Sequence, residues 1–155
     1  THCESSAASD VYKRQVKSDL NINYLNASPE SLDTDLKFDV ILNLEVVEHV
    51  EDLNLYLSSC SNLIKKGGIM FTATLNRTFV SYIKAIIGAE YILRWLPIGT
   101  HDWNKFIKPE ELEGILMKSK FKNLETKGLQ FNPFYRSWSK SDNHSVNYIM
   151  VSEKI

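Results

Sequence analysis

The sequence predicts an α/β fold built around a parallel sheet, and three consecutive segments carry that prediction. Residues 38–44 read as an apolar strand, residues 53–64 as an amphipathic helix, and residues 69–74 as a second apolar strand. Strands that run parallel need a crossover between them, which is usually a helix packed on the sheet. The chain has 155 residues, 43% of them hydrophobic, which is enough for one domain with its own core.

The first elements are expected in the following order. A short strand over residues 21–26 ends at the Ser28-Pro29 break, and the strand over residues 38–44 follows, buried because most of its residues are apolar. The helix over residues 53–64 is then expected to end in the Lys-Lys-Gly-Gly run at 65–68. Basic residues suit the last turn of a helix, and glycine adopts the left-handed conformation that closes it.

The second half of the chain predicts one helix and two strands. Pro109 suits the first position of a helix, and the acidic residues Glu110 and Glu111 suit its first turn. Residues 121–129 and 146–151 read as strands separated by a polar loop. We expect these two strands to pair as an antiparallel hairpin at the edge of the sheet.

Composition excludes several classes of protein. A net charge of -1 provides no basic surface for nucleic acid, so no nucleic-acid partner is expected. The two cysteines, Cys3 and Cys60, form no disulfide or metal-binding pattern, which fits a reducing cytoplasm. Residues 1–15 have no helical or strand period and are interpreted as a foreign or disordered tail, with the folded domain spanning residues 16–155.

Three potential metal ligands follow the first apolar strand directly: Glu45, Glu48 and His49. In a helical or tight turn, positions i, i+3 and i+4 share one face, so the three side chains can converge on one ion. Two carboxylates favour Mg²⁺ or Mn²⁺, and a single histidine is too few for a typical catalytic zinc site. The alternative is a solvated acidic turn with a hydrogen-bonded histidine.

Two further pairs are candidate site residues. Asn76 and Arg77 follow the carboxyl end of a strand, where open α/β sheets bind ligands, although both can equally cap a loop. His101 and Asp102 are candidates for accepting a substrate proton, since histidine titrates near neutral pH and a neighbouring carboxylate can orient it. The alternative for this pair is a cap on the helix that begins near Lys108.

The segment over residues 78–99 is unusually apolar and forms a predicted insertion. Aromatic and aliphatic side chains with few charges suit an element that lies in a membrane interface. The alternative is a lid packed on the protein's own core. The membrane candidates in this segment are Ile83, Ile86, Ile87 and Trp95.

Several motifs together resemble the ubiquinone-biosynthesis O-methyltransferase family. They are Phe-Asp-Val at 38–40, Glu-Val-Val-Glu-His-Val at 45–50, Lys-Gly-Gly at 66–68, Thr-Leu-Asn-Arg at 74–77, and the blocks at 88–93, 99–102 and 105–109. The resemblance implies a Rossmann-like class I methyltransferase fold that uses S-adenosylmethionine. It also implies transfer of the methyl group to a hydroxyl of a polyprenyl catechol or demethylubiquinol.

The resemblance further assigns residues and partners. It implies Mg²⁺ held by Glu45, Glu48 and His49, with Leu44 touching the methyl donor and Glu30 lying where related enzymes line the adenine. It implies peripheral association with lipid at the cytoplasmic face of the inner membrane. A ubiquinone-biosynthesis complex is the implied protein partner.

The chain also departs from the family pattern. The glycine-rich loop after the family's first strand, and the acidic residue after the second, have no counterpart here. The chain therefore resembles the C-terminal two-thirds of such an enzyme, and we expect an incomplete sheet. The alternative to an enzyme is an inactive fragment or a non-enzymatic module at a membrane surface.

Overall fold

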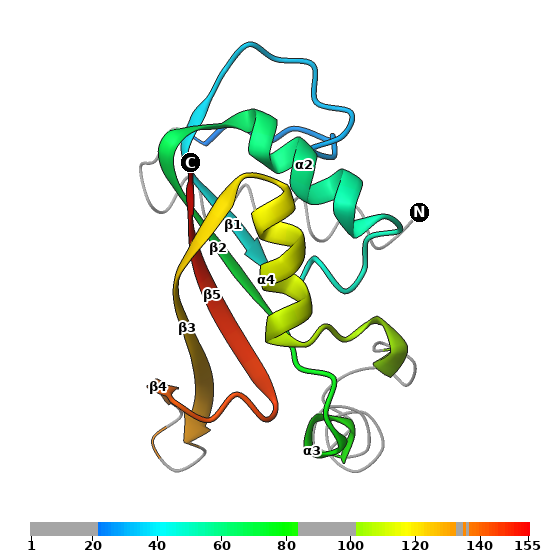
Figure 1. Ribbon diagram of the computed structural model, residues 1–155, viewed down its shortest axis with the longest axis vertical. Helices are drawn as coiled ribbons and strands as arrows, with labels where there is room; N and C mark the ends of the chain where they lie inside the picture. The colour runs from blue at the N-terminus through cyan, green and yellow to red at the C-terminus, as the bar shows by residue number, and fades with distance from the viewer. Residues whose placement is uncertain (1–21, 84–101, 133–134, 136) are drawn as a thin grey trace.

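The computed structural model describes residues 22–83, 102–132, 135 and 137–155 (Figure 1). Its centre is a mixed sheet crossed on one face by two helices, which confirms the predicted α/β class. In the described part of the chain, five strands pair in the order β1-β2-β5-β3-β4. The strands are β1 (Phe38–Leu44), β2 (Ile64–Leu75), β3 (Phe121–Asn132), β4 (Ser137–Ser141) and β5 (Asn147–Lys154).

The predicted βαβ unit is present. β1 and β2 pair in parallel, and helix α2 (Leu53–Leu63) connects them. Asp52 caps the start of α2, because its Oδ1 accepts hydrogen bonds from the backbone of Asn54 and Leu55 at 2.9 and 3.0 Å. β5 then runs antiparallel to β2 and places Asn147 opposite Leu75.

The main core lies between the sheet and the helices α2 and α4 (Pro109–Lys118). Leu57 from α2 and Leu112 from α4 are fully buried there. Tyr148 of β5 is also fully buried, and its hydroxyl donates to the carbonyl of Ile107 at 3.0 Å, just before α4. The remaining buried members of this cluster are Val47, Tyr56, Cys60, Ile64, Met70, Ile107, Leu116, Phe121 and Met150.

β1 is formed where predicted, but the prediction that it is buried is wrong. Val40, Leu42 and Leu44 share one face of the strand and are 50%, 62% and 52% exposed. Asn43 points to the opposite face, where its Oδ1 accepts a hydrogen bond from the hydroxyl of Tyr56 at 2.8 Å. Helices α2 and α4 cover only that second face (Figure 1), so the apolar residues of the first face remain accessible.

The predicted glycine cap on α2 is also wrong. The helix ends at Leu63, and the next residue, Ile64, already has an extended backbone and starts β2. Gly67 does have a left-handed φ of 78°, but it lies inside β2. The register changes here, because Phe38 pairs with Ile64 while Val40 pairs with Ile69. Gly67 therefore provides the left-handed backbone of a bulge in β2, and it does not end helix α2.

The C-terminal strands confirm the predicted antiparallel pair and add to it. β3 and β5 pair antiparallel, and β4 adds an outer strand beside β3 that was not predicted. The sequence does not predict β4, because SWSKS has a single large apolar residue and so shows no alternation of apolar and polar residues. The short strand expected over 21–26 is not formed: residues 22–26 are irregular and exposed, and Asn21 lies outside the described residues, as does the tail over 1–15.

We expect replacement of Leu112 by alanine to lower the free energy of unfolding by about 2–5 kcal/mol, because it leaves a cavity between α4 and the sheet. Met117 lies on the same helix but is 65% exposed, so Met117→Ala serves as the matched control. Urea titration followed by circular dichroism measures both variants. Equal effects of the two substitutions would contradict the placement of α4.

Candidate functional site

The candidate site lies at the edge of the sheet where β1 and β2 end. Glu45 extends the ladder beyond β1, since its backbone N–H donates to the carbonyl of Ala73 at 2.9 Å. Asn76 follows β2, and its N–H donates to the carbonyl of Val146 just before β5 at 2.9 Å. Loops after parallel strands bind ligands in open α/β sheets, so this edge is where a site is expected.

Glu48 is the most buried acidic residue of this edge, with 3% of its surface exposed. Its Oε2 accepts a hydrogen bond from the hydroxyl of Thr74 on β2 at 2.7 Å. Its other carboxylate oxygen, Oε1, is buried and has no hydrogen-bond partner in the described residues. A buried carboxylate oxygen without a partner is costly, which marks it as a position for a ligand.

Glu45 and Glu48 form a pair of neighbouring carboxyl groups. Part of Glu45 reaches solvent, yet burial of its carboxyl is the largest cause that raises its pKa, to about 8. The negative charge of the neighbouring Glu48 raises this pKa further. Two adjacent negative charges repel each other, which favours the protonated form of Glu45.

The two carboxyl groups fit a hard divalent cation, but His49 does not join them. Oxygen ligands suit Mg²⁺, and a cation would relieve the repulsion between Glu45 and Glu48 and engage the partnerless Oε1. His49 is exposed, and the described part of the chain contains no group of three or more His, Cys, Asp or Glu side chains arranged to hold a metal. The shared-face argument requires continuous helical backbone, whereas Glu45 has a φ of 55°.

The two residues predicted to contact the methyl donor lie in different surroundings. Leu44 is the last residue of β1 and is 52% exposed, next to Glu45. Glu30 lies in an exposed turn that closes with a hydrogen bond from the N–H of Ser31 to the carbonyl of Ser28 at 3.1 Å. Both side chains are accessible to a ligand.

Asn76 ties the carboxyl end of β2 to the turn before β5. Its Nδ2 donates to the carbonyl of His144 at 2.7 Å, while its Oδ1 is buried without a partner in the described residues. The neighbouring Arg77 forms an ion pair with Glu111 at the start of α4. Asn76 therefore has one atom left for a ligand, whereas Arg77 is engaged in joining two elements.

Asp102 acts as a cap in this structure. Its Oδ1 accepts hydrogen bonds from the backbone N–H and the side-chain amide of Asn104 at 3.0 and 3.1 Å, at the start of the 3-10 helix η2 (Trp103–Lys105). Its predicted partner His101 lies outside the described residues, as do Ile86, Ile87 and Trp95.

The start of the predicted insertion is described and presents apolar side chains. Ile83 is 43% exposed, and Phe79 of the short helix α3 (Phe79–Ser81) is 74% exposed. Thr78 holds this helix in place, because its hydroxyl accepts from the N–H of Ser81 at 3.0 Å. A membrane-crossing helix would need a longer apolar run than any helix in the described part of the chain provides.

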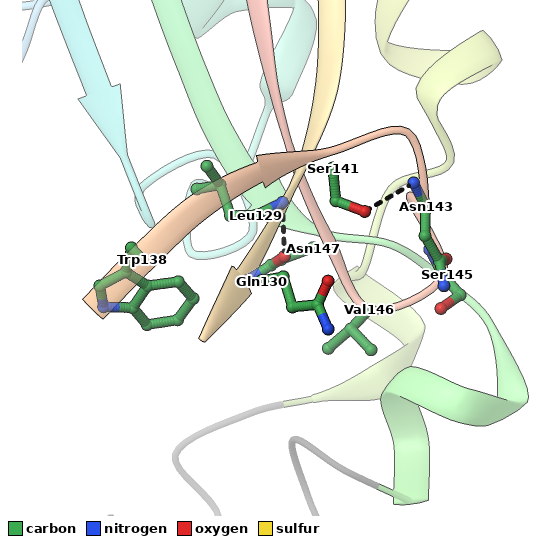
Figure 2. Close-up of a pocket in the computed structure, with 8 residues that line it drawn as sticks. All are labelled: Leu129, Gln130, Trp138, Ser141, Asn143, Ser145, Val146 and Asn147. Atoms are coloured by element: carbon green, nitrogen blue, oxygen red, sulfur yellow. Dashed lines mark hydrogen bonds between the residues drawn. The ribbon is translucent and has the colours of Figure 1, made fainter. Parts of the chain in front are cut away.

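A cavity of about 270 Å³ opens between β3, β4 and the turn that leads into β5 (Figure 2). Polar side chains dominate its lining, which includes Gln130, Asn143 and Asn147. Trp138 of β4 forms another part of its wall. Asn76 fixes the turn that leads into β5, because its backbone N–H donates to the carbonyl of Val146 and its side-chain amide donates to the carbonyl of His144.

Sequence reasoning missed several residues of this edge. Thr74 on β2 donates a hydrogen bond to Glu48, and the Nε2 of His144 is buried without a partner in the described residues. A polar residue that alternates with apolar ones on a buried strand was the available signal for Thr74. Nothing local in the sequence marks Gln130, Asn143 and Asn147, because only the fold brings them together.

Comparison with known proteins identifies relatives along most of the chain. Residues 4–126 match the family described as Methyltransferase domain. The chain is 54% identical over 133 residues to a ubiquinone biosynthesis O-methyltransferase of Pelagibacter ubique, covering 86% of this chain and 55% of that protein. It is 47% identical over 139 residues to the protein of the same name from Bartonella quintana, covering 89% and 56%. The predicted resemblance is thereby confirmed, and the chain spans about half the length of these relatives.

Solved structures are similar in fold. An S-adenosylmethionine-dependent methyltransferase from Clostridium acetobutylicum superimposes with a TM-score of 0.63 at 14% identity, over 95% of this chain and 70% of that one. A SAM-dependent methyltransferase from Thermotoga maritima gives a TM-score of 0.60 at 19% identity, over 86% and 65%. At such identities the likeness concerns the fold alone, and it confirms the predicted Rossmann-like methyltransferase architecture.

We predict that Thr74→Val lowers the free energy of unfolding by about 1–3 kcal/mol, because it removes the one hydrogen bond to a buried Glu48 oxygen. Thr72 is the matched control: it lies on the same strand, is equally buried, and its hydroxyl has no partner in the described residues. Thr72→Val should leave stability unchanged or raise it slightly. Urea titrations at neutral pH compare the two, and a larger loss for Thr72→Val would refute the assignment.

Proposed function

Since the chain belongs to the methyltransferase-domain family, we propose that it forms part of an enzyme that transfers a methyl group from S-adenosylmethionine to a hydroxyl of a polyprenyl catechol or demethylubiquinol. The observation that carries this proposal is the identity with ubiquinone biosynthesis O-methyltransferases along most of the chain. The paired carboxyl groups at the carboxyl edge of the sheet support it, because that edge binds ligands in this kind of fold.

The reaction moves one methyl group between two substrates. A hydroxyl oxygen of the catechol attacks the methyl carbon, a C–O bond forms, and the C–S bond breaks with its electron pair left on sulfur. The proton of the hydroxyl passes to a base, for which His101 and Asp102 are the candidates from the sequence. In-line displacement of this kind depends mainly on alignment of the two reactants, which the loops at the ends of β1 and β2 are placed to provide.

Each site residue has a proposed part in this reaction. Glu45 and Glu48 would hold Mg²⁺, while His49, the third ligand implied by the family resemblance, is exposed and lies apart from the pair in this structure. When bound, a divalent ion lowers the pKa of a catechol hydroxyl and fixes its oxygen. Leu44 contacts the methyl donor from the end of β1, and Glu30 lies beside its adenine.

A second candidate function is a non-enzymatic or inactive role of the chain. The chain spans about half the length of its relatives, and β1 presents an accessible apolar face. Both observations suit a protein that binds to another surface and has no catalytic activity of its own. Activity measured in the context of a full-length relative separates the two functions.

The experiment replaces the matching segment of the Pelagibacter ubique relative with this chain and measures methyl transfer from S-adenosylmethionine to a catechol. Glu45→Gln in this chimera should lower the Mg²⁺-dependent rate about tenfold or more, because it removes a charged metal ligand. Glu51→Gln, an exposed change a few residues away, should leave the rate unaltered. No turnover by the unsubstituted chimera would favour the non-enzymatic role, and equal rates of the variants would exclude Glu45 as a ligand.

We also propose peripheral binding to lipid at the cytoplasmic face of the inner membrane, near other enzymes of ubiquinone biosynthesis. The start of the insertion supports this, since Phe79, Val80, Tyr82 and Ile83 are all exposed. Apolar side chains grouped on a surface favour an interface with lipid, and a polyprenyl substrate itself resides there.

Changing Phe79 and Ile83 together to asparagine should weaken binding to lipid vesicles about tenfold or more, because the transfer of each apolar side chain out of water lowers the free energy of the bound state. Vesicle co-sedimentation measures the effect. Leu36 and Tyr135 are 67% and 82% exposed elsewhere, so their double change to asparagine is the control. If both double variants bind like the unsubstituted chain, the membrane role is excluded for this part of the insertion.

A further inference from the structure

Another cavity, of about 230 Å³, opens where helix α4 ends and β3 begins. Met117 of α4, Phe121 of β3 and Ile155 after β5 contribute apolar side chains to its lining. Met117 and Ile155 are 65% and 59% exposed, so this lining is open to solvent. Because roughly 150 Å³ suffices for benzene, the cavity can accept one apolar side chain of a ligand. Residues 117–123 and Ile155 form the α4–β3 corner.

Positive charge gathers at this corner, although the net charge of the whole chain is -1. Lys122 lines the cavity, and Lys118 and Lys120 lie just before β3. All three are exposed, and none forms an ion pair with a carboxylate of the described residues. Lys154 adds a fourth cation, whose pKa is lowered by burial and then by the charge of Lys120. Glu153, opposite Lys122 on β5, offsets only part of this charge.

Asn123 adds a polar group to the lining of the cavity. Its Nδ2 donates to the Oε1 of Glu113 at 3.2 Å and to the Oγ1 of Thr126 at 3.1 Å, which fixes the amide. Its Oδ1 is buried and has no partner among the described residues. A buried acceptor without a partner costs free energy, and an N–H group of a bound peptide would satisfy it.

The first part of β3 is also an edge of the sheet. In the described part of the chain, residues 121–127 pair with β5 alone, because β4 joins β3 only from Gly128 onward. Lysines on an edge can serve to keep copies of a protein apart, and the register shift between Asn123 and Glu125 interrupts this edge. An extended ligand would therefore be held mainly by its side chains and by few backbone contacts.

The corner lies at the other end of the sheet from the candidate site. Phe121 pairs with Lys154 at the end of β5, whereas Asn147 at the start of β5 pairs with Leu75 at the end of β2. Figure 1 shows the C-terminus and the start of β3 at one end of the sheet and α3 at the other. A ligand at the corner therefore leaves the acidic pair and α3 accessible.

We propose that the α4–β3 corner binds an acidic segment of a partner protein, with one apolar side chain in the cavity and carboxylates at the flanking lysines. A buried apolar side chain contributes affinity, and complementary charges contribute specificity. A peptide also supplies the backbone N–H that the Oδ1 of Asn123 lacks. This interaction goes beyond the proposed methyl transfer and does not depend on it.

The probe is a blocked peptide, Asp-Glu-Phe-Glu-Asp, titrated at low salt into the full chain labelled with ¹⁵N. Backbone amide signals of residues 117–123 should shift along one saturation curve, and binding should weaken as salt is added. Changing Lys118 and Lys122 together to glutamine should raise the dissociation constant about three- to tenfold. The same double change at Lys105 and Lys108, which are exposed before the start of α4, removes equal charge and should leave binding unaltered.

The cavity is tested separately from the lysines. Met117→Ala should weaken binding of the peptide about threefold or more, because it removes an exposed part of the apolar lining. Leu55→Ala on α2, where Leu55 is 54% exposed, is the matched control and should bind the peptide normally. A peptide with glycine in place of phenylalanine should bind more weakly and respond little to Met117→Ala.

Several results would overturn this inference. They are the absence of a saturable shift up to millimolar peptide, equal dissociation constants for the two lysine pairs, and equal binding of a basic peptide, Lys-Arg-Phe-Arg-Lys. Binding to anionic lipid vesicles that requires Lys118 and Lys122, without binding of the acidic peptide, would assign the corner to a membrane instead. An inactive chimera would reject the methyl transfer and leave the corner unaffected, so the two proposals fail separately.

Discussion

The pairing of β2 with a parallel strand on one side and an antiparallel strand on the other is the constraint on which the rest of the structure depends. Parallel pairing brings the carboxyl ends of β1 and β2 to one edge. Antiparallel pairing brings the beginning of β5 to that same edge. As a result, the acidic turn after β1, the amide of Asn76 after β2 and the turn before β5 are neighbours, although 100 residues of sequence lie between the first and the last.

The acidic part of this edge is held by burial rather than by charge pairing. Glu48 is a buried residue of the turn after β1, and its carboxylate accepts a hydrogen bond from the hydroxyl of Thr74 in β2. Desolvation of the Glu45 carboxyl and the nearby charge of Glu48 raise the pKa of Glu45 to about 8. Two adjacent carboxylates repel each other, and a cation that neutralised them would relieve this repulsion.

The neutral and acidic parts of the edge are complementary. Two neighbouring carboxyl groups form the acidic part, whereas amide, hydroxyl and apolar side chains line the cavity. Asn76 connects the loop after β2 with the turn that walls the cavity through two hydrogen bonds. The helices α2 and α4 pack behind this edge and hold the strands in register.

The sequence by itself determined the βαβ unit, helix α4 and the antiparallel partners β3 and β5, because hydrophobic period and capping residues are local signals. It also marked Glu45 and Glu48, which lie close in the chain. Local signals could not reveal that one face of β1 is accessible or that Gly67 forms part of a bulge in β2. They also could not reveal that a polar segment forms β4 through backbone hydrogen bonds with β3. Only the tertiary structure decided that Thr74 supports Glu48, and that Gln130, Asn143 and Asn147 share one cavity. Those contacts depend on strand order and register, which local patterns of residues do not specify.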